Sequence, residues 1–297
     1  MSVSVAIKNA CETTGEGPHW QAETSSLLFV DILNGGVHRW NSSSGEHTQV
    51  HLGSPVGFVV PSVRGDLAIG LARTISRLDF ETVTTETMVE VEQGTNNRFN
   101  DGKCDPHGRL WAGTMGHEVT PGGEIERQRG SLYSLDKERY LSTHASHIDI
   151  SNGLAWSSDN QTFFYIDSLP RKLYAYDYDL QPGTVRNQRV AVDFESIGIP
   201  DGMCIDVHDR LWVACYNGGK VVCVDPVTGQ IINTVEFPVK RVTSCCFGGP
   251  QLDELYVTSG KAGLSEVEFS VEQPLAGSVF KVTGLGVKGV PSQTYQG

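Results

Sequence analysis

Four residues with side-chain oxygen atoms stand in short glycine-containing segments at separate points of the chain: Glu16, Asn100, Asn152 and Asp201. Glycine close to such a residue permits tight turns and close approach of the backbone. Two carboxylates and two amide carbonyls, with no Cys or His among them, form an all-oxygen ligand set that suits Ca²⁺, Mg²⁺ or Mn²⁺ and suits copper poorly. Each could also be an ordinary turn residue, because Asn and Asp are common in turns. Their function therefore depends on the elements that position them.

A β-type apolar run recurs six times along the 297 residues. The runs begin at Leu27, Leu67, Leu110, Phe163, Leu211 and Leu255, so their starts lie 40, 43, 53, 48 and 44 residues apart. Each run is followed by a short polar turn and a second alternating segment, such as Val37–Trp40 or Leu173–Tyr176. Alternation with period two, β-branched and aromatic residues and intervening Gly or Asp are typical of hairpins. The repeated unit is therefore predicted to be a β-meander.

A repeat of roughly 40–50 residues with about four strands has the size of a propeller blade. We predict an all-β fold, a six-bladed β-propeller with four-stranded antiparallel blades around a central channel. A linear solenoid is the alternative, but it would need polar capping repeats at both ends, which the sequence does not show. Because no linker or charge block divides the chain, residues 1–297 are expected to form one domain whose first and last segments share a blade.

This fold would bring the polar residues together. Counted back from the apolar run of each repeat, Glu16, Ser54, Asn100, Asn152, Asp201 and Ser244 lie 11, 13, 10, 11, 10 and 11 residues upstream. We expect the strand before each run to be the innermost one, with these residues in the turn that leads into it, at one end of the channel. Equivalent positions in successive blades converge on the axis. Unpaired carboxylates would repel one another there, so a divalent cation is the expected resolution.

Composition and charge restrict the possible partners. The 33 glycines and 13 prolines favour a turn-rich β protein over a helical one. The formal net charge of −12 makes nucleic acid and anionic membranes poor partners and draws cations to a concave acidic site. No apolar run reaches the ~20 residues that cross a bilayer, and residues 1–20 lack the layout of a signal peptide. We therefore expect a cytoplasmic protein with no membrane partner, and the oligomeric state stays open, with a monomer compatible.

The seven cysteines are spread through apolar runs at positions 11, 104, 204, 215, 223, 245 and 246. Their odd number and the absence of CxxC spacing indicate neither a disulfide framework nor a zinc cluster. We predict that they are buried thiols.

Two long segments carry Gly, Pro and charge with little periodicity, residues 116–130 and residues 260–277. Both are predicted to be surface loops. The first follows the apolar run Trp111–Thr114 and could reach over one end of the ring as a lid.

Several segments around these residues resemble the regucalcin and gluconolactonase family, to which luciferin-regenerating enzymes are related. They include Asn97–Lys103, Asp149–Leu154, Pro200–Met203, Leu211–Gly219, Thr243–Gly249 and Gly284–Gly289. The resemblance extends from Glu16 to the C-terminus. It departs at Gly17, where we expect serine in the vertebrate proteins; the glycine is more similar to insect and bacterial members, which leaves the substrate less certain.

The resemblance implies one divalent metal ion (Ca²⁺, Zn²⁺, Mn²⁺ or Mg²⁺) held by Glu16, Asn152 and Asp201, and hydrolysis of sugar lactones. It also implies that Arg98, Asn100 and Glu118 contact the hydroxyls of the small-molecule substrate. As an acidic residue beside the metal, Asp201 is the candidate catalytic base. Two alternatives stay open: a calcium-binding regulatory protein that uses the same site without catalysis, and a propeller scaffold that binds other proteins.

Overall fold

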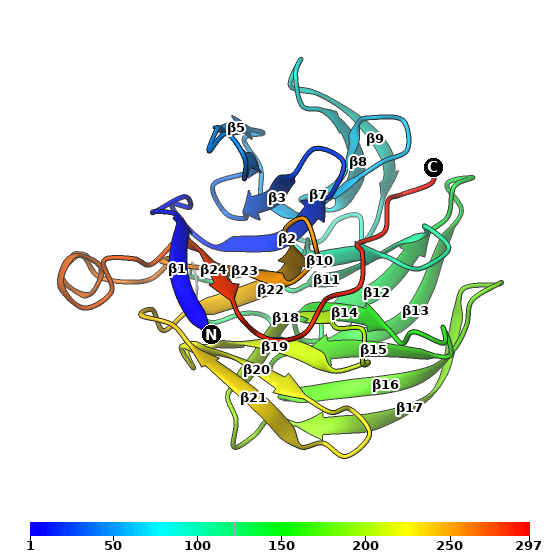
Figure 1. Ribbon diagram of the computed structural model, residues 1–297. Helices are drawn as coiled ribbons and strands as arrows, with labels where there is room; N and C mark the ends of the chain where they lie inside the picture. Colours follow the sequence, from blue (N-terminus) through cyan, green and yellow to red (C-terminus); the bar gives the residue numbers. More distant parts are fainter. Residues whose placement is uncertain (121–122) are drawn as a thin grey trace.

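In residues 1–120 and 123–297, which the computed structural model describes, 24 strands form six four-stranded antiparallel sheets arranged as blades around a central axis (Figure 1). The predicted six-bladed β-propeller is therefore confirmed. In five blades the strand that comes first in the sequence lies next to the axis and the following strands lie progressively closer to the rim; in the sixth, the N-terminal strand is the outermost.

The strands follow the chain from blade to blade. The first blade holds β2 (Gly15–Gln21), β3 (Ser26–Asp31), β4 (Gly36–Asn41) and β5 (His47–His51). The second holds β6 (Val56–Pro61), β7 (Leu67–Leu71), β8 (Thr74–Asp79) and β9 (Thr84–Glu90). The third holds β10 (Arg98–Cys104), β11 (Leu110–Met115), β12 (Gly130–Leu135) and β13 (Leu141–Ile148).

The fourth blade holds β14 (Ser151–Trp156), β15 (Thr162–Asp167), β16 (Lys172–Asp179) and β17 (Thr184–Asp193). The fifth holds β18 (Ile199–Ile205), β19 (Leu211–Tyr216), β20 (Lys220–Val224) and β21 (Ile231–Glu236). The sixth combines β22 (Val242–Gly248), β23 (Glu254–Ser259) and β24 (Val279–Thr283) with the N-terminal strand β1 (Ser2–Ile7).

The ring closes through the pairing of β1 with β24, in which Val3 lies opposite Val282. The prediction that the first and last segments share a blade is thus confirmed. After β24 the chain crosses one face of the ring (Figure 1), where Val207 N–H donates to Lys288 O at 3.0 Å and Tyr295 N–H donates to Pro61 O at 2.9 Å. This C-terminal segment ties the fifth blade to the second across the end of the channel.

Every innermost strand contains a β-bulge near its beginning. The register shifts fall between Glu16 and His19, Val56 and Val59, Phe99 and Asp101, Asn152 and Leu154, Pro200 and Met203, and Val242 and Ser244. A bulge leaves a residue without a partner in the ladder and changes the direction of its side chain. Our prediction placed the candidate residues in the preceding turns, and the structure places five of the six within the bulged strands; Ser54 precedes β6. Strand alternation alone cannot show where an extra residue enters a ladder.

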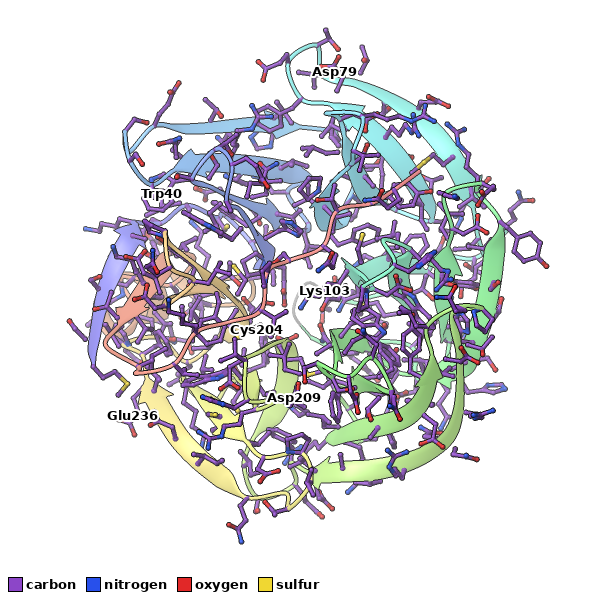
Figure 2. All side chains as sticks on the ribbon, turned by 45° about the vertical axis from the view of Figure 1, so that its right-hand side comes forward. Trp40, Asp79, Lys103, Cys204, Asp209 and Glu236 are labelled. Carbon is purple, nitrogen blue, oxygen red and sulfur yellow. The ribbon has the colours of Figure 1, made fainter. Side chains whose placement is uncertain are left out.

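Large side chains from neighbouring blades pack between the sheets and form the core. Trp111 of the third blade contacts Phe163 of the fourth with ring centroids 5.0 Å apart, and Trp20 of the first stacks on Tyr256 of the sixth at 5.3 Å. The seven cysteines are buried and free, as predicted. In the side-chain view, Lys103 points into the central channel, while Asp79 and Glu236 lie at the rim (Figure 2).

A buried aspartate organises the turn between the first two strands in the third and fifth blades. Asp105 and Asp206 each accept hydrogen bonds from the backbone N–H groups two and four residues later, at 2.8–3.1 Å. Their other carboxylate oxygens accept the indole N–H of Trp111 and Trp212, both at 3.0 Å. One carboxylate thus fixes the turn and orients the tryptophan that packs between blades.

The segment 260–277, predicted to be a surface loop, contains a short π-helix, η1 (Glu268–Glu272). Ser265 Oγ accepts a hydrogen bond from the N–H of Glu268 at 3.2 Å, and the Glu268 carboxylate accepts one from the N–H of Ser265 at 2.8 Å. This reciprocal capping, which our prediction overlooked, explains the helical turn. Among the described residues, no helix has the length and apolar character that spanning a membrane requires.

We predict that Asp206→Ala lowers the free energy of unfolding by about 2–4 kcal/mol, because it leaves the buried Trp212 indole N–H and two backbone donors without acceptors. Urea unfolding followed by tryptophan fluorescence measures the change. Asp253→Ala, at an exposed position, is the control and should stay within about 0.5 kcal/mol of the wild type. Equal midpoints for the wild type and Asp206→Ala would contradict this role.

Candidate active site

The six residues predicted to bind metal or substrate line one cavity of about 250 Å³ at an end of the central channel: Glu16, Arg98, Asn100, Glu118, Asn152 and Asp201. Asn100 and Asp201 lie within the bulges of β10 and β18, and Glu16 and Asn152 border those of β2 and β14. Ser54 and Ser244, at the corresponding positions of the other two blades, do not line the cavity. The site is therefore asymmetric, with its polar groups contributed by four of the blades.

Glycines let the inner strands approach one another closely. A Cβ at Gly153 would lie 2.9 Å from the backbone oxygen of Asp201 and 2.7 Å from Cγ of Met203, closer than real Cβ contacts come. Gly17 has a φ of 54°, a conformation that side chains rarely adopt, and its N–H donates to Oε2 of Glu16 at 2.9 Å. Small residues next to the site residues thus set the distance between blades.

Hydrogen bonds orient the two amide side chains. Asn152 Nδ2 donates to Oγ of Ser168 at 2.8 Å, while its Oδ1 accepts from Asn100 Nδ2 at 3.2 Å. Asn100 Nδ2 also donates to the backbone oxygen of Ser151 at 2.9 Å, and its Oδ1 accepts from Arg98 Nη1 at 2.7 Å. Ser168, which our prediction missed, therefore fixes the orientation of the Asn152 side-chain amide, with Nδ2 towards Ser168 and Oδ1 towards Asn100.

The segment 116–130 meets the cavity, and two of its residues, 121 and 122, lie outside the described part of the chain. Glu118 pairs with Ile125 in a short bridge, and its Oε1 lies 3.5 Å from Arg98 Nη2. The segment is anchored by Arg127, whose Nε donates to Asp149 Oδ1 at 2.8 Å and whose Nη2 donates to Oδ2 at 2.6 Å. Glu118 and Ile125 both line the cavity, so this segment forms part of its wall.

Buried carboxyl groups crowd this end of the channel. Burial, and next the charge of Asp101, raise the pKa of Glu16 from its ordinary value of 4.5 to about 8. Burial, together with the charges of Glu16 and Asp101, also raises the pKa of Asp201 well above its ordinary range. Desolvation and like charges both disfavour the ionised forms. A cation would reverse both effects, so the donor set fits a divalent metal ion.

Asp101 is a second residue that our prediction missed. It directly follows Asn100 and is buried, and burial raises its pKa, an effect that the charge of Lys103 opposes. Lys103 Nζ donates to the backbone oxygen of Met203 at 2.7 Å inside the channel. The sequence Asn100-Asp101-Gly102 contained this carboxylate, but the repeat offsets singled out only its neighbour.

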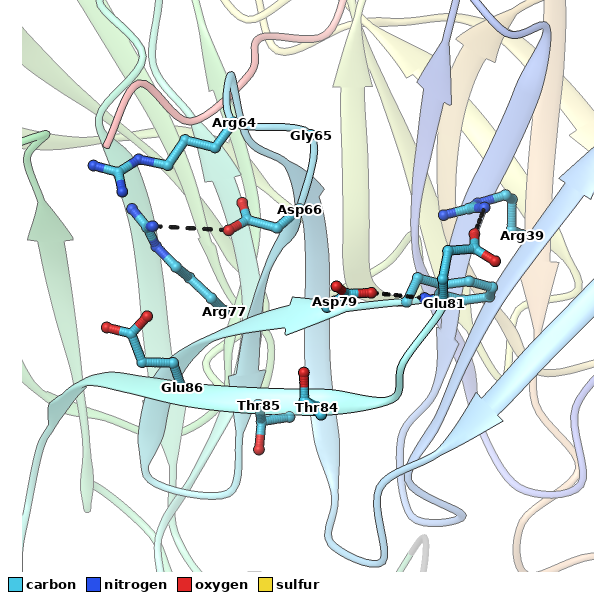
Figure 3. Close-up of a pocket in the computed structure, with 11 residues that line it drawn as sticks. Arg39, Arg64, Gly65, Asp66, Arg77, Asp79, Glu81, Thr84, Thr85 and Glu86 are labelled. Carbon is cyan, nitrogen blue, oxygen red and sulfur yellow. Dashed lines mark hydrogen bonds and ion pairs between the residues drawn. The ribbon is translucent and has the colours of Figure 1, made fainter.

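A larger groove, of about 560 Å³, lies on the rim between the first and second blades (Figure 3). Four of its charged residues are paired with one another: Arg39 Nη1 lies 2.8 Å from Glu81 Oε1, and Arg77 Nη1 lies 3.8 Å from Asp66 Oδ2. None of the six predicted site residues lines it. The smaller axial cavity is therefore the candidate active site.

Residues 14–261 match the family model described as the SMP-30/gluconolactonase/LRE-like region. The chain belongs to this family. It is similar to regucalcin from Gallus gallus, with 47% identity over 285 residues and 95% of each chain covered. Among solved structures it is similar to a luciferin-regenerating enzyme, with 38% identity, a TM-score of 0.90 and 99% of each chain covered.

The chain is also similar to the solved structure of a calcium-binding protein, regucalcin, from Agrobacterium tumefaciens. The two share 26% identity with a TM-score of 0.91, over 99% of this chain and 97% of that one. The family resemblance carried by the sequence motifs is therefore confirmed, and it extends over the whole fold.

Above pH 7 we predict that the metal-free protein loses stability as the pH rises. The folded state keeps a proton on Glu16 up to a pKa of about 8, whereas the unfolded chain releases it near pH 4.5, so rising pH favours unfolding between these values. The buried His19 and His38, with pKa values lowered to about 3, act in the opposite direction only below about pH 6.5.

The measurement is urea unfolding of chelator-treated protein at pH 7 and pH 8. We expect the free energy of unfolding to fall by about 1 kcal/mol across this interval in the wild type, and by less in Glu16→Gln. Identical slopes for the two proteins would show that Glu16 does not hold the proton.

Proposed function

We propose that this protein is a divalent-metal-dependent hydrolase that opens sugar lactones, as a gluconolactonase does. The observation that carries the proposal is the meeting of three oxygen ligands, Glu16, Asn152 and Asp201, with Arg98, Asn100 and Glu118 around one cavity. Its volume of about 250 Å³ suits a small molecule, since drug-sized ligands occupy pockets of about 300–1,000 Å³. Membership of the SMP-30/gluconolactonase/LRE-like family supports the same substrate class.

Glu16, Asn152 and Asp201 would hold one divalent ion, Ca²⁺, Zn²⁺, Mn²⁺ or Mg²⁺. When bound, the ion polarises the lactone carbonyl and stabilises the negative charge that develops on its oxygen. Asp201 takes the proton of the attacking water, because it is an acidic residue in the cavity wall that ionises once a cation offsets its neighbours. It returns that proton to the ring oxygen as the ester bond breaks.

Arg98 and Glu118 would position the substrate through hydrogen bonds to its hydroxyls. Arg98 Nη1 is occupied by Asn100 Oδ1 at 2.7 Å, whereas the contact of Nη2 with Glu118 is longer, at 3.5 Å. That looser pair faces the cavity and can open to receive a hydroxyl group. We expect the substrate to be a small molecule and the protein to act on it in the cytoplasm.

A calcium-binding protein without catalysis is the second candidate. The similarity to the structure from Agrobacterium tumefaciens, with a TM-score of 0.91, supports this candidate, because that protein is named a calcium-binding protein. Such a protein needs Glu16, Asn152 and Asp201 but has no need of Arg98 and Glu118 beside them. The likeness to a luciferin-regenerating enzyme adds a third possible chemistry at the same site. Turnover of a lactone separates the first candidate from the other two.

We expect gluconolactone hydrolysis to stop in EDTA and to return with Ca²⁺, Zn²⁺, Mn²⁺ or Mg²⁺. Asp201→Asn should remain folded and lose about 10²–10⁴-fold in kcat, which is the usual contribution of a general base. Asp253→Asn, on the exposed surface, should keep full activity. Hydrolysis that persists in EDTA, no hydrolysis with any metal, or full activity in Asp201→Asn would overturn the proposal.

We further expect Arg98→Lys to raise KM for the lactone about tenfold with a smaller change in kcat, because Lys cannot reproduce the planar arrangement of guanidinium donors. Steady-state kinetics on metal-loaded enzyme measures both constants. The exposed Arg64→Lys serves as the matched control. A KM equal to that of the wild type would remove Arg98 from the substrate site.

A further inference from the structure

A second group of metal-ligating side chains lies in the first blade and the segment that leads into it. Cys11, Asp31 and His38 are fully buried, and their ligand atoms all lie within 4.8 Å of one another. Cys11 precedes β2, Asp31 ends β3 and His38 lies in β4. Glu16 pairs with Val30, the residue before Asp31, so the group adjoins the strand that carries an axial carboxylate.

His38 presents one nitrogen to this group. Its Nδ1 lies 3.0 Å from Nε2 of His47, while its Nε2 is buried and has no hydrogen-bond partner among the described residues. A Cβ at Gly36 would lie 2.9 Å from this Nε2 and 3.3 Å from Cβ of Asp31, so the free nitrogen is on the side of the aspartate. Buried polar atoms are rarely left unpaired, and a histidine that bonds through Nδ1 is oriented to ligate a metal through Nε2.

Asp31 and Cys11 are held in place by the backbone. The Asp31 carboxylate accepts the N–H of Glu12 at 2.6 Å and those of Thr13 and Thr14 at 3.0 Å. The Thr13 hydroxyl also donates to Oδ1, so Oδ1 is saturated. Oδ2 accepts the Glu12 N–H and only a longer bond of 3.3 Å from the Thr13 N–H, so it is the oxygen that keeps a lone pair for a cation. Cys11 N–H donates to the backbone oxygen of Gly277 at 2.9 Å, which ties its segment to the sixth blade. The three ligands are thus positioned before any metal binds.

We propose that Cys11, Asp31 and His38 form a second, zinc-type metal site, separate from the axial site. One thiolate, one carboxylate and one neutral imidazole balance the charge of a divalent ion, and a sulfur ligand selects Zn²⁺ over Ca²⁺ or Mg²⁺. On binding, the Cys11 S–H bond is replaced by an S–metal bond and the proton passes to solvent. With three protein ligands, a water completes the tetrahedral set. The bound ion would fasten the segment before β2 to the first blade.

Cobalt is the probe, because a thiolate bound to Co²⁺ gives a near-ultraviolet charge-transfer band that oxygen ligands do not give. We expect chelator-stripped wild type to take up two equivalents of Co²⁺ and to show this band for one of them. Cys11→Ser should lose the band and one equivalent, and His38→Gln should bind the thiolate-linked ion at least tenfold more weakly. Glu16→Gln should lose the other equivalent and keep the band.

Cys245→Ser is the matched control, because Cys245 and Cys204 are also buried, with their sulfurs 3.6 Å apart. It should keep the band. The absence of this band in the wild type would overturn the proposal, because it would show that Cys11 binds no metal ion. So would a band that survives in Cys11→Ser or disappears in Cys245→Ser. If Cys11→Ser does not fold, the cobalt titration of His38→Gln decides. The readout does not use lactone hydrolysis, so its outcome is independent of the proposed activity.

Discussion

Crowding of buried carboxyl groups at one end of the channel is the constraint on which the rest of the site depends. Glu16, Asp101 and Asp201 come from three different blades, and burial raises the pKa of each. The charge of Lys103 opposes the rise in the pKa of Asp101, but its ammonium group donates to the backbone oxygen of Met203. Burial of several carboxyl groups destabilises the fold unless a cation binds between them, and neutral side chains would serve a purely structural role better.

The backbone creates the crowding through a single repeated device. A bulge in each inner strand turns one or two side chains towards the axis, and residues such as Gly153 and Gly202 let the strands pack closely. The side chains in these bulges differ from blade to blade. Asn152 and Asp201 face the cavity in the fourth and fifth blades, whereas the sixth presents Ser244 against Gly202. A nearly symmetric ring thus holds an asymmetric set of polar groups.

Much of this could be predicted from the sequence, because β-meander repeats leave a regular spacing of apolar runs. The six apolar runs that begin between Leu27 and Leu255 predicted the number of blades. The equivalent offsets of Glu16, Asn152 and Asp201 predicted that these residues meet, and all three line one cavity. The bulges could not be predicted, because inner strands such as β6, β14 and β22 are buried on both faces and therefore show no polar–apolar alternation in which an extra residue would appear as a phase shift. Asp101 was missed because the repeat offsets singled out only its neighbour Asn100, and the register shift between Phe99 and Asp101 could not be foreseen.

Contacts between residues far apart in the chain were also beyond reach of the sequence. Cys11, Asp31 and His38 have no recognisable ligand spacing, so the cysteines were predicted only to be buried thiols. The reciprocal bonds of Ser265 and Glu268 are the exception, because Ser-x-x-Glu is a local capping signal that the sequence contained and our prediction overlooked. Ser168, by contrast, orients Asn152 from the end of the neighbouring strand β15. Tertiary contacts of this kind depend on the register between strands, which local patterns specify weakly.

The central claim is that the carboxyl groups at the axis hold a divalent ion. Anomalous diffraction from crystals grown with Mn²⁺ tests it most directly, since the signal locates the metal without reference to activity. We predict a peak coordinated by Glu16, Asp201 and the side-chain oxygen of Asn152. A cavity without such a peak at saturating Mn²⁺, or a peak bound by none of these three residues, would contradict it.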